Sequence, residues 1–382
     1  MTPLPLLFLF LFLLLAVVLT HAQVPVIDLS GLGKDVHTSA QIDQALQQYG
    51  LFVGTNALQS SASLASMRAA EELFALPSEE KQRIKVAGGG FMRGYIPFGQ
   101  ESGLKDTFFE PKEGFAYGYS FEDREGAGNG DSDGTTGGDS EFRNALEGDN
   151  VWPAEELFTG KKIMKLMFDM STRIATNIVN SVSASYKHHT KEDLGLILDG
   201  GDRISIMRLF HYFAKSDKSV IGDRAEESII GSSPHTDWGL LTVITQQEQI
   251  GGLQALYNGN WVDVPSDIPG SVVVNGGDFL SLLSKGRYKS PVHRVQSPKS
   301  SDRMSYVYFF YPNFDTPLDM ACTLKDEEGI ASGADTEGKQ EYNTLLSRDA
   351  LHGDDSDAEL VFGDYIVNKW KGVFRPDVST EV

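Results

Sequence analysis

The sequence predicts a mainly β protein with flanking helices, in which a sandwich or jelly roll follows a helical N-terminal region. The first observation is that residues 203–317 contain seven short runs rich in β-branched and aromatic residues, separated by Gly, Pro, Asn and Asp. The second is that earlier segments carry apolar residues at helical spacing. With 382 residues, of which 41% are hydrophobic and 23% charged, the chain can bury a sizeable core.

The N-terminal elements are predicted in alternation. "VPVIDLSGL" (residues 24–32) indicates a strand and a turn, and "AQIDQALQQYGLF" indicates a helix that ends near Gly50. "LFVGTNAL" follows as a strand, and "SLASMRAAEELFAL" as a second helix that stops at Pro77. A long helix is predicted from about residue 154 to residue 186. Its apolar face, which we interpret as core packing, comprises Ile163, Leu166, Met170, Ile174, Ile178 and Val182.

Changes in composition divide the chain into six regions. These are an N-terminal leader (1–22), an N-terminal region (23–119), an acidic, Gly-rich insertion (120–150), a long-helix region (151–200), the β-domain (201–317) and an acidic loop with a C-terminal tail (318–382). The segment from Phe121 to Asn150 holds nine acidic and two basic residues, which is typical of a solvated loop.

The N-terminal leader is predicted to be a signal peptide. The uncharged run from Leu6 to Leu19 has 14 residues, which suits a signal-peptide core better than a membrane span of about 20 residues. "THA" before Gln23 offers small residues for cleavage. Because no Lys or Arg precedes the run, a retained membrane anchor stays open as the alternative. We therefore expect entry into the secretory pathway.

The net charge argues against two classes of partner, and the cysteine count excludes an intrachain disulfide. The formal charge of -20 argues against nucleic acid and against binding of the mature domain to anionic membranes. The single cysteine, Cys322, rules out an intrachain disulfide, and we interpret it as a structural residue. We expect a monomer that takes a small-molecule substrate.

A candidate metal site begins in the stretch "SSPHTDWGLLTVITQ", where His235 and Asp237 are one residue apart. If both lie on a strand, they point to the same side of it. A third ligand is offered by His293 in "SPVHRVQSP". Two histidines and one carboxylate form the facial triad of non-haem Fe(II) sites, which leaves open positions for an organic acid and for O2.

A possible carboxylate fork lies ten residues after His293. Arg303 and Ser305 in "DRMSYVYFF" share one strand face. The Arg guanidinium matches a carboxylate in its planar geometry, and Ser adds a hydroxyl. Such a fork near an iron site suits a dicarboxylate whose other end chelates the metal.

Together these motifs resemble the iron- and 2-oxoglutarate-dependent dioxygenases of the plant-hormone and flavonoid type, the group that includes isopenicillin N synthase. The resemblance extends over nearly the whole mature chain, from "RGYIPFGQE" and "KEGFAYG" to "HTDWGLLTVITQ", "SVVVNGGDFLSLLSKGRYKSPVHRV" and "RMSYVYFFYPN". It implies a double-stranded β-helix flanked by helices. It implies that His235, Asp237 and His293 hold Fe(II), and that Arg303 and Ser305 bind the distal carboxylate of 2-oxoglutarate.

The family's Asn-x-Tyr-Pro motif is only partly kept. Tyr212 matches its tyrosine and is a candidate 2-oxoglutarate contact, whereas Phe210 and Phe213 stand at the Asn and Pro positions. These departures leave the details of cosubstrate binding open. His211 should face the opposite side of the strand, so we do not count it as a ligand.

The resemblance implies hydroxylation or desaturation of a small organic molecule with O2, coupled to the release of succinate and CO2, with ascorbate as a supporting reductant. Aromatic candidates for the pocket suit a mostly apolar substrate, although ordinary core packing is an equal alternative. The candidate substrate residues are Phe309, Tyr311, Arg208, Trp238, Tyr95 and Phe98.

Two other functions stay open at this point. An oxidase like isopenicillin N synthase would need Fe(II) and O2 but no 2-oxoglutarate, and its Arg and Ser could bind the substrate's own carboxylate. A non-catalytic jelly-roll binding protein would bind small molecules without iron. Succinate formation would distinguish the dioxygenase from the oxidase, which forms none. Iron binding would distinguish the dioxygenase from the non-catalytic binding protein.

Overall fold

The structure is a computed structural model that describes residues 23–86, 93–100, 107–119, 146, 149–190, 204–316 and 361–373. The predicted leader, most of the acidic insertion, Cys322 and most of the acidic C-terminal region lie outside these residues. None of the helices in the described ranges is long and apolar enough to cross a membrane.

Two β-sheets form the centre of the fold, as the sequence predicts. Within them, all pairings of the described strands are antiparallel except that of β1 with β2. The large sheet has the spatial order β1 (Val26–Asp28), β2 (Leu51–Thr55), β10 (Val272–Gly276), β7 (Leu241–Gln246), β12 (Arg303–Phe310), β5 (Ile206–Tyr212), β4 (Lys112–Gly118), β3 (Gly94–Ile96). The small sheet has the order β6 (Ser232–His235), β11 (His293–Val295), β8 (Leu253–Tyr257), β9 (Asn260–Asp263).

The large sheet separates two apolar cores. One face packs against the small sheet through a cluster that includes Phe210, Tyr212 and Val307. The other face packs against the helices through residues such as Tyr306 and Tyr308. Because strand neighbours alternate between faces, the sequence position of each side chain on β5 and β12 decides which core it enters.

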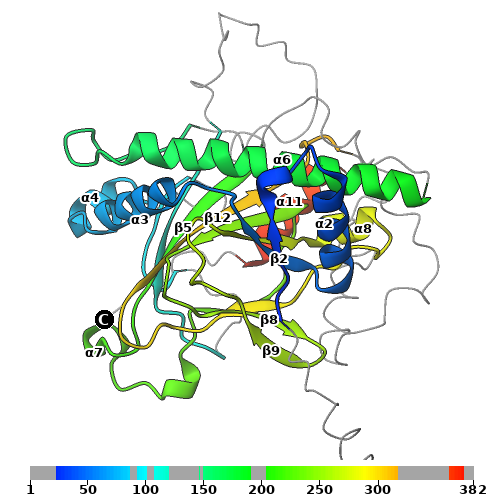
Figure 1. The fold of residues 1–382 in the computed structure, drawn as a ribbon. Helices are drawn as coiled ribbons and strands as arrows, with labels where there is room; N and C mark the ends of the chain where they lie inside the picture. The colour runs from blue at the N-terminus through cyan, green and yellow to red at the C-terminus, as the bar shows by residue number, and fades with distance from the viewer. Residues whose placement is uncertain are drawn as a thin grey trace, which may run out of the picture.

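Helices cover the outer face of the large sheet, with α6 lying across it beside α3 (Figure 1). Over the described ranges the helices are α2 (Val36–Gln48), α3 (Ser60–Phe74), α4 (Ser78–Arg83), α6 (Lys161–Thr190), α7 (Lys218–Ile221), α8 (Asp278–Leu283) and α11 (Phe362–Val373), with short 3-10 turns η1 (Leu29–Gly31) and η4 (Glu226–Ser228). Of these, α7 lies away from the outer face (Figure 1). The short helix that follows Pro77, α4, is not predicted from the sequence.

The long helix α6 begins at Lys161 rather than near residue 154. A β-carbon on Gly160 would meet the ring of Phe158 at 2.7 Å, so the chain passes this point only as glycine before the helix starts. Its packing face is also rotated from the predicted one, because Leu166 is 43% exposed while Met164 is buried. The interpretation of its Met-rich stripe as core packing holds.

Candidate metal centre

The two predicted histidine ligands lie opposite each other on neighbouring strands of the small sheet. His235 ends β6, and His293 begins β11 as its register partner, with ring centroids 4.3 Å apart. The Nδ1 atom of His235 lies 2.7 Å from the carbonyl oxygen of Ser233, and that of His293 lies 3.0 Å from the carbonyl oxygen of Pro291. A proton on each Nδ1 satisfies these carbonyls and leaves each Nε2 lone pair for a metal.

The carboxylate ligand lies in a loop. Asp237 follows the end of β6, so the expectation that it shares a strand face with His235 is wrong. Long-range bonds hold it instead: Asn275 at the end of β10 donates to Asp237 Oδ2 at 2.6 Å. The backbone N–H of Asp278, at the start of α8, donates to the Asp237 carbonyl oxygen at 2.7 Å. The loop therefore presents its carboxylate between the two sheets.

The three side chains could hold one metal ion. His235 Nε2 lies 3.8 Å from Asp237 Oδ1, and His293 Nε2 lies 3.7 Å from Asp237 Oδ2. One ligand atom from each residue lies within 4.8 Å of the others. Ligand atoms held about 2.1 Å from a common ion lie roughly 3–4 Å apart, so only small adjustments are needed.

The protonation states suit metal binding. Burial and the neighbouring His293 lower the pKa of His235 to about 4, so its ring is neutral at pH 7. Burial raises the pKa of Asp237, but the two histidines and hydrogen bonds from Thr242 and Asn275 outweigh it and leave the pKa below its ordinary value. The site thus offers two imidazoles and one carboxylate, which is the donor set for Fe(II).

The predicted carboxylate fork lies on the inner face of the large sheet, the face that packs against the small sheet. Arg303 and Ser305 of β12 pair in register with Tyr212 and Phe210 of β5. The guanidinium carbon of Arg303 lies 5.1 Å from the centroid of the Tyr212 ring. Gln246 of β7, the register partner of Ser305, accepts from Arg303 Nη2 at 3.2 Å. Four polar side chains from three adjacent strands therefore converge.

Several atoms of this cluster have unused hydrogen-bonding capacity. Arg303 is 1% exposed, and its Nε and Nη1 have no hydrogen-bond partner among the described residues. The buried Oγ of Ser305 has none there either. Buried polar groups are normally satisfied, so these donors fit a bound carboxylate. The residues present thus fit 2-oxoglutarate.

Two of the predicted substrate residues, Arg208 and Phe309, lie on the inner face, whereas Tyr311 and Trp238 pack with the core under the helices. Arg208 of β5 is buried two strand positions from Phe210. Phe309 packs against both apolar cores and stacks on Tyr311 at 6.4 Å. Trp238 is half-buried beside Asp237.

The structure does not place Tyr95 at the proposed substrate site. Its hydroxyl donates to Glu113 at 2.5 Å, and its ring belongs to the core under the helices, on the side away from the inner face. Phe98 is 38% exposed and makes edge contacts with Phe109 and Phe213. His211 bonds to Glu113 and Asp302, so its exclusion as a ligand is correct.

Sequence reasoning missed three groups of polar residues around the site. The places of Asn275 and Gln246 at the site depend on the strand register, which the sequence does not show. The only signal in the sequence is that each is a polar residue at the end of an apolar run, "SVVVN" or "LTVITQ". A buried ion pair joins Lys112 Nζ to Glu110 Oε2 at 2.7 Å. Glu110 also accepts from the backbone N–H of Ser233, two residues before His235.

Replacing Asn275 with Ala should weaken iron binding by roughly 10- to 100-fold, the usual cost of losing a partner of a metal ligand. The variant loses the hydrogen bond that orients Asp237. Competition with a chromogenic chelator under anaerobic conditions measures the change. Asn260→Ala, on exposed β9, is the matched control. Equal iron affinity in the two variants would show that Asn275 does not orient the ligand.

Comparisons with known proteins identify the family of the chain. Residues 203–312 match the model of the 2OG-Fe(II) oxygenase superfamily, and residues 24–155 match the N-terminal model of non-haem dioxygenases in morphine synthesis. The homoarginine-6-hydroxylase 2-ODD-C23 of Glycine max is 30% identical over 320 residues, covering 80% of this chain and 90% of the relative. The 2-oxoglutarate-dependent dioxygenase citB of Monascus ruber is 29% identical over 325 residues, covering 80% of this chain and 90% of the relative.

The fold has solved counterparts. A full-length Neurospora crassa protein, solved in complex with alpha-KG, matches with a TM-score of 0.62 and 24% identity, over 86% of this chain and 98% of that chain. The dioxygenase for auxin oxidation of Arabidopsis thaliana matches with a TM-score of 0.56 and 20% identity, over 81% of this chain and the whole of the other. The family models and these relatives show that the chain belongs to the 2OG-Fe(II) oxygenase superfamily and is a dioxygenase that uses Fe(II) and 2-oxoglutarate.

Proposed function

We propose that this dioxygenase hydroxylates or desaturates a small organic molecule while it converts 2-oxoglutarate and O2 to succinate and CO2. The observation that carries the proposal is the buried fork of Arg303 and Ser305 on the face of the large sheet that packs against the small sheet, which carries the two histidine ligands. Arg303 Nε and Nη1 and Ser305 Oγ have no hydrogen-bond partner among the described residues. A non-catalytic binding protein would have no need for a metal triad beside such a fork.

The residues divide the work between two ends of the cosubstrate. Arg303 and Ser305, with Tyr212 and Gln246, would bind its distal carboxylate by charge-assisted hydrogen bonds. Its keto-acid end would chelate the metal held by His235, Asp237 and His293. Fe(II), when bound there, supplies the one-electron chemistry that O2 requires. The protein's part is to orient both reactants and to keep water away from them.

The substrate site is proposed from aromatic side chains on and just after β12 and beside the Asp237 loop. Phe309, Tyr311 and Trp238 offer apolar surface, and Arg208 offers a cation for an acidic or polar group. The names of relatives mention homoarginine and auxin, so family membership does not choose the substrate. We keep a small, mostly apolar organic molecule as the proposed class.

For the whole protein, we propose a monomer, and we propose that it enters the secretory pathway. The uncharged run from Leu6 to Leu19 supports the second of these proposals. Expression with a C-terminal tag, followed by N-terminal sequencing of the purified protein, tests the proposed cleavage before Gln23. A native Met1 on membrane-bound protein would support the anchor instead.

Succinate formation is the decisive test of the function. The protein is incubated with Fe(II), ascorbate and 2-oxoglutarate, then exposed to 18O2 with a panel of small organic acids and apolar ring compounds. We expect one succinate per substrate consumed, with one labelled oxygen atom in succinate. The other appears in the product on hydroxylation and in water on desaturation. Substrate oxidation without succinate would contradict the proposal and favour the oxidase alternative.

A further inference from the structure

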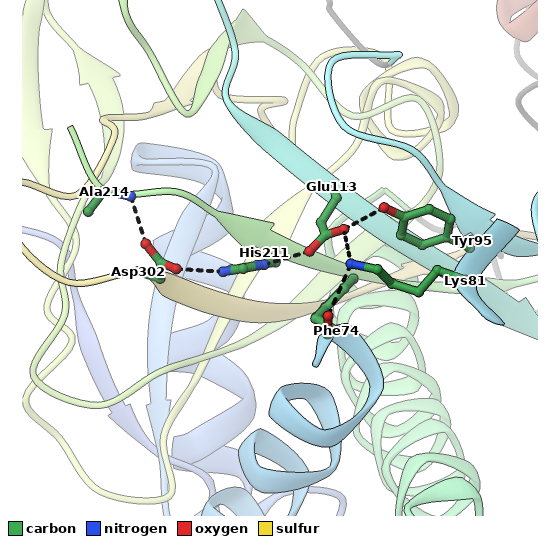
Figure 2. Close-up of polar contacts among 7 residues, drawn as sticks. All are labelled: Phe74, Lys81, Tyr95, Glu113, His211, Ala214 and Asp302. Carbon is green, nitrogen blue, oxygen red and sulfur yellow. Dashed lines mark hydrogen bonds and ion pairs between the residues drawn. The ribbon is translucent and has the colours of Figure 1, made fainter. Parts of the chain in front are cut away.

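A buried histidine next to the proposed cosubstrate site bonds to two carboxylates at once. His211 follows Phe210 on β5 and faces the helices, on the side of the sheet opposite Tyr212. Its Nδ1 lies 2.8 Å from Glu113 Oε1, and its Nε2 lies 2.9 Å from Asp302 Oδ2 (Figure 2). A neutral imidazole has one N–H and can donate to only one of them, so both bonds need the imidazolium.

The two carboxylates are anchored in turn by elements around the sheet. Glu113 Oε2 accepts from Lys81 Nζ at 2.9 Å and from the Tyr95 hydroxyl at 2.5 Å (Figure 2). Lys81 also donates to the carbonyl oxygen of Phe74 at the end of α3. Two cations thus balance two carboxylates when His211 is protonated.

Asp302 fixes the other end of the cluster. Its Oδ1 accepts from the backbone N–H of Ala214, just after β5, at 2.8 Å (Figure 2). Asp302 immediately precedes Arg303, the first residue of β12. The network Lys81–Glu113–His211–Asp302–Ala214 therefore joins the ends of β4, β5 and β12 from the outer side.

On the inner side, the same strand ends carry the proposed cosubstrate residues. Tyr212 is the register partner of both Arg303 and Lys112, and His211 is the register partner of Met304 and Glu113. Movement of β5 against β12 would therefore change the place of Tyr212 relative to Arg303. Because a guanidinium fork requires close geometry, such a shift weakens binding of a carboxylate.

From this arrangement we infer that His211 is a positioning residue for 2-oxoglutarate, holding Tyr212 and Arg303 in register by bridging Glu113 and Asp302. The inference rests on the proposed binding of the distal carboxylate at Arg303. It assigns a role to a side chain that touches neither the metal ligands nor the cosubstrate.

The bridge should depend on pH. Burial lowers the pKa of His211, but the hydrogen bonds to Glu113 and Asp302 outweigh it and leave the pKa above its ordinary value near 6.5. The charged or titratable groups that face it are Glu113, Asp302, Lys81 and Tyr95, and burial raises the pKa of Tyr95 further above its ordinary value. The Asp302 side chain is 41% exposed, so protons can exchange with solvent.

The sign follows from the raised pKa of His211. The bridge is complete below the ordinary histidine value and is lost as pH rises through the raised folded-state value. We expect the affinity for 2-oxoglutarate to fall over the same range. The carboxylates of 2-oxoglutarate titrate far below it and do not contribute.

The test compares the dissociation constant for 2-oxoglutarate of wild type, His211→Phe and Asp302→Asn between pH 6 and 9. Binding is followed by the visible charge-transfer band of the Fe(II)–2-oxoglutarate complex under anaerobic conditions. His211→Phe retains ring packing on Phe74 and Phe213 but cannot bridge. We expect its dissociation constant for 2-oxoglutarate to rise roughly 5- to 10-fold at pH 6.5, in the range of ordinary coupling between linked sites. Iron content, and the rate of uncoupled succinate formation at saturating 2-oxoglutarate, should stay at wild-type values.

Asp302→Asn supplies the second readout. An amide can donate to the neutral Nε2 while Nδ1–H donates to Glu113, so the network is satisfied without a proton. We expect wild-type affinity with no fall at high pH. Unchanged affinity in His211→Phe, or a wild-type pH profile in Asp302→Asn, would overturn the role of His211. If wild type and Arg303→Lys bind 2-oxoglutarate equally well, the proposed cosubstrate site itself fails, and the inference with it.

Discussion

Replacing His293 with Ala should leave the protein without iron and without turnover. His293 is buried, supplies one of three ligand atoms, and pairs with His235 across the two strands. The loss should exceed the roughly 10- to 100-fold expected when only a partner of a ligand is removed, because a donor itself is lost. Iron per chain after anaerobic reconstitution and gel filtration measures binding, and succinate formation measures turnover.

The matched control is His189→Ala, which removes an imidazole at the end of α6 that bonds to the carbonyl oxygen of Ser185. This variant should retain one iron per chain. His293→Ala should still fold, because its ring makes one hydrogen bond, to the Pro291 carbonyl oxygen, and circular dichroism checks this. Stoichiometric iron and normal succinate formation in a folded His293→Ala protein would refute the triad.

The residue types at the metal site could be predicted from sequence, but their placement could not. The imidazole of His293 is recognised as a ligand by chemistry and by family motif, 56 residues away from Asp237. That Asp237 occupies a loop depends on hydrogen bonds from Asn275 and Asp278, which lie about 40 residues further along the chain. Local periodicity carries no information on such contacts. Asp237 is therefore a candidate ligand as predicted, but it lies in a loop and not on the strand face that was expected.

The same limit explains the other errors. Short runs rich in β-branched and aromatic residues predict β5, β7, β10 and β12 well, because these central strands are buried on both faces of the sheet. The side of the sheet to which the Tyr95 side chain points depends on the pairing of β3 with β4 and on the hydrogen bond to Glu113. The Gly-rich sequence around Tyr95 predicts neither contact. At Gly160, just before α6 begins, a β-carbon would also meet Ala69 of α3 at 2.8 Å, and this is a tertiary contact that local periodicity does not reveal.

Replacing Arg303 with Met should abolish measurable 2-oxoglutarate binding without harming the fold. No carboxylate of the described residues lies within ion-pair distance of this buried guanidinium, and burial lowers its pKa, as expected for a cation held away from water. Because burying a charge that lacks an opposite charge costs free energy, we expect an apolar side chain of similar size to leave the folded state at least as stable. The loss of two charge-assisted hydrogen bonds, each worth about 1.5–3 kcal/mol, should weaken binding by roughly 100-fold or more.

Thermal unfolding separates the two effects. In wild type, 2-oxoglutarate at about 100 times its dissociation constant should add about 2.7 kcal/mol of stability and raise Tm, with Fe(II) present throughout. The Arg303→Met protein should start at an equal or higher Tm and should not respond to 2-oxoglutarate. Arg303→Lys keeps the charge but loses the planar fork, so an intermediate response is expected. A lower Tm of Arg303→Met in the absence of 2-oxoglutarate would mean that Tyr212 and Gln246 already compensate the guanidinium, and that the fork is a structural feature of the sheet rather than a site prepared for an anion.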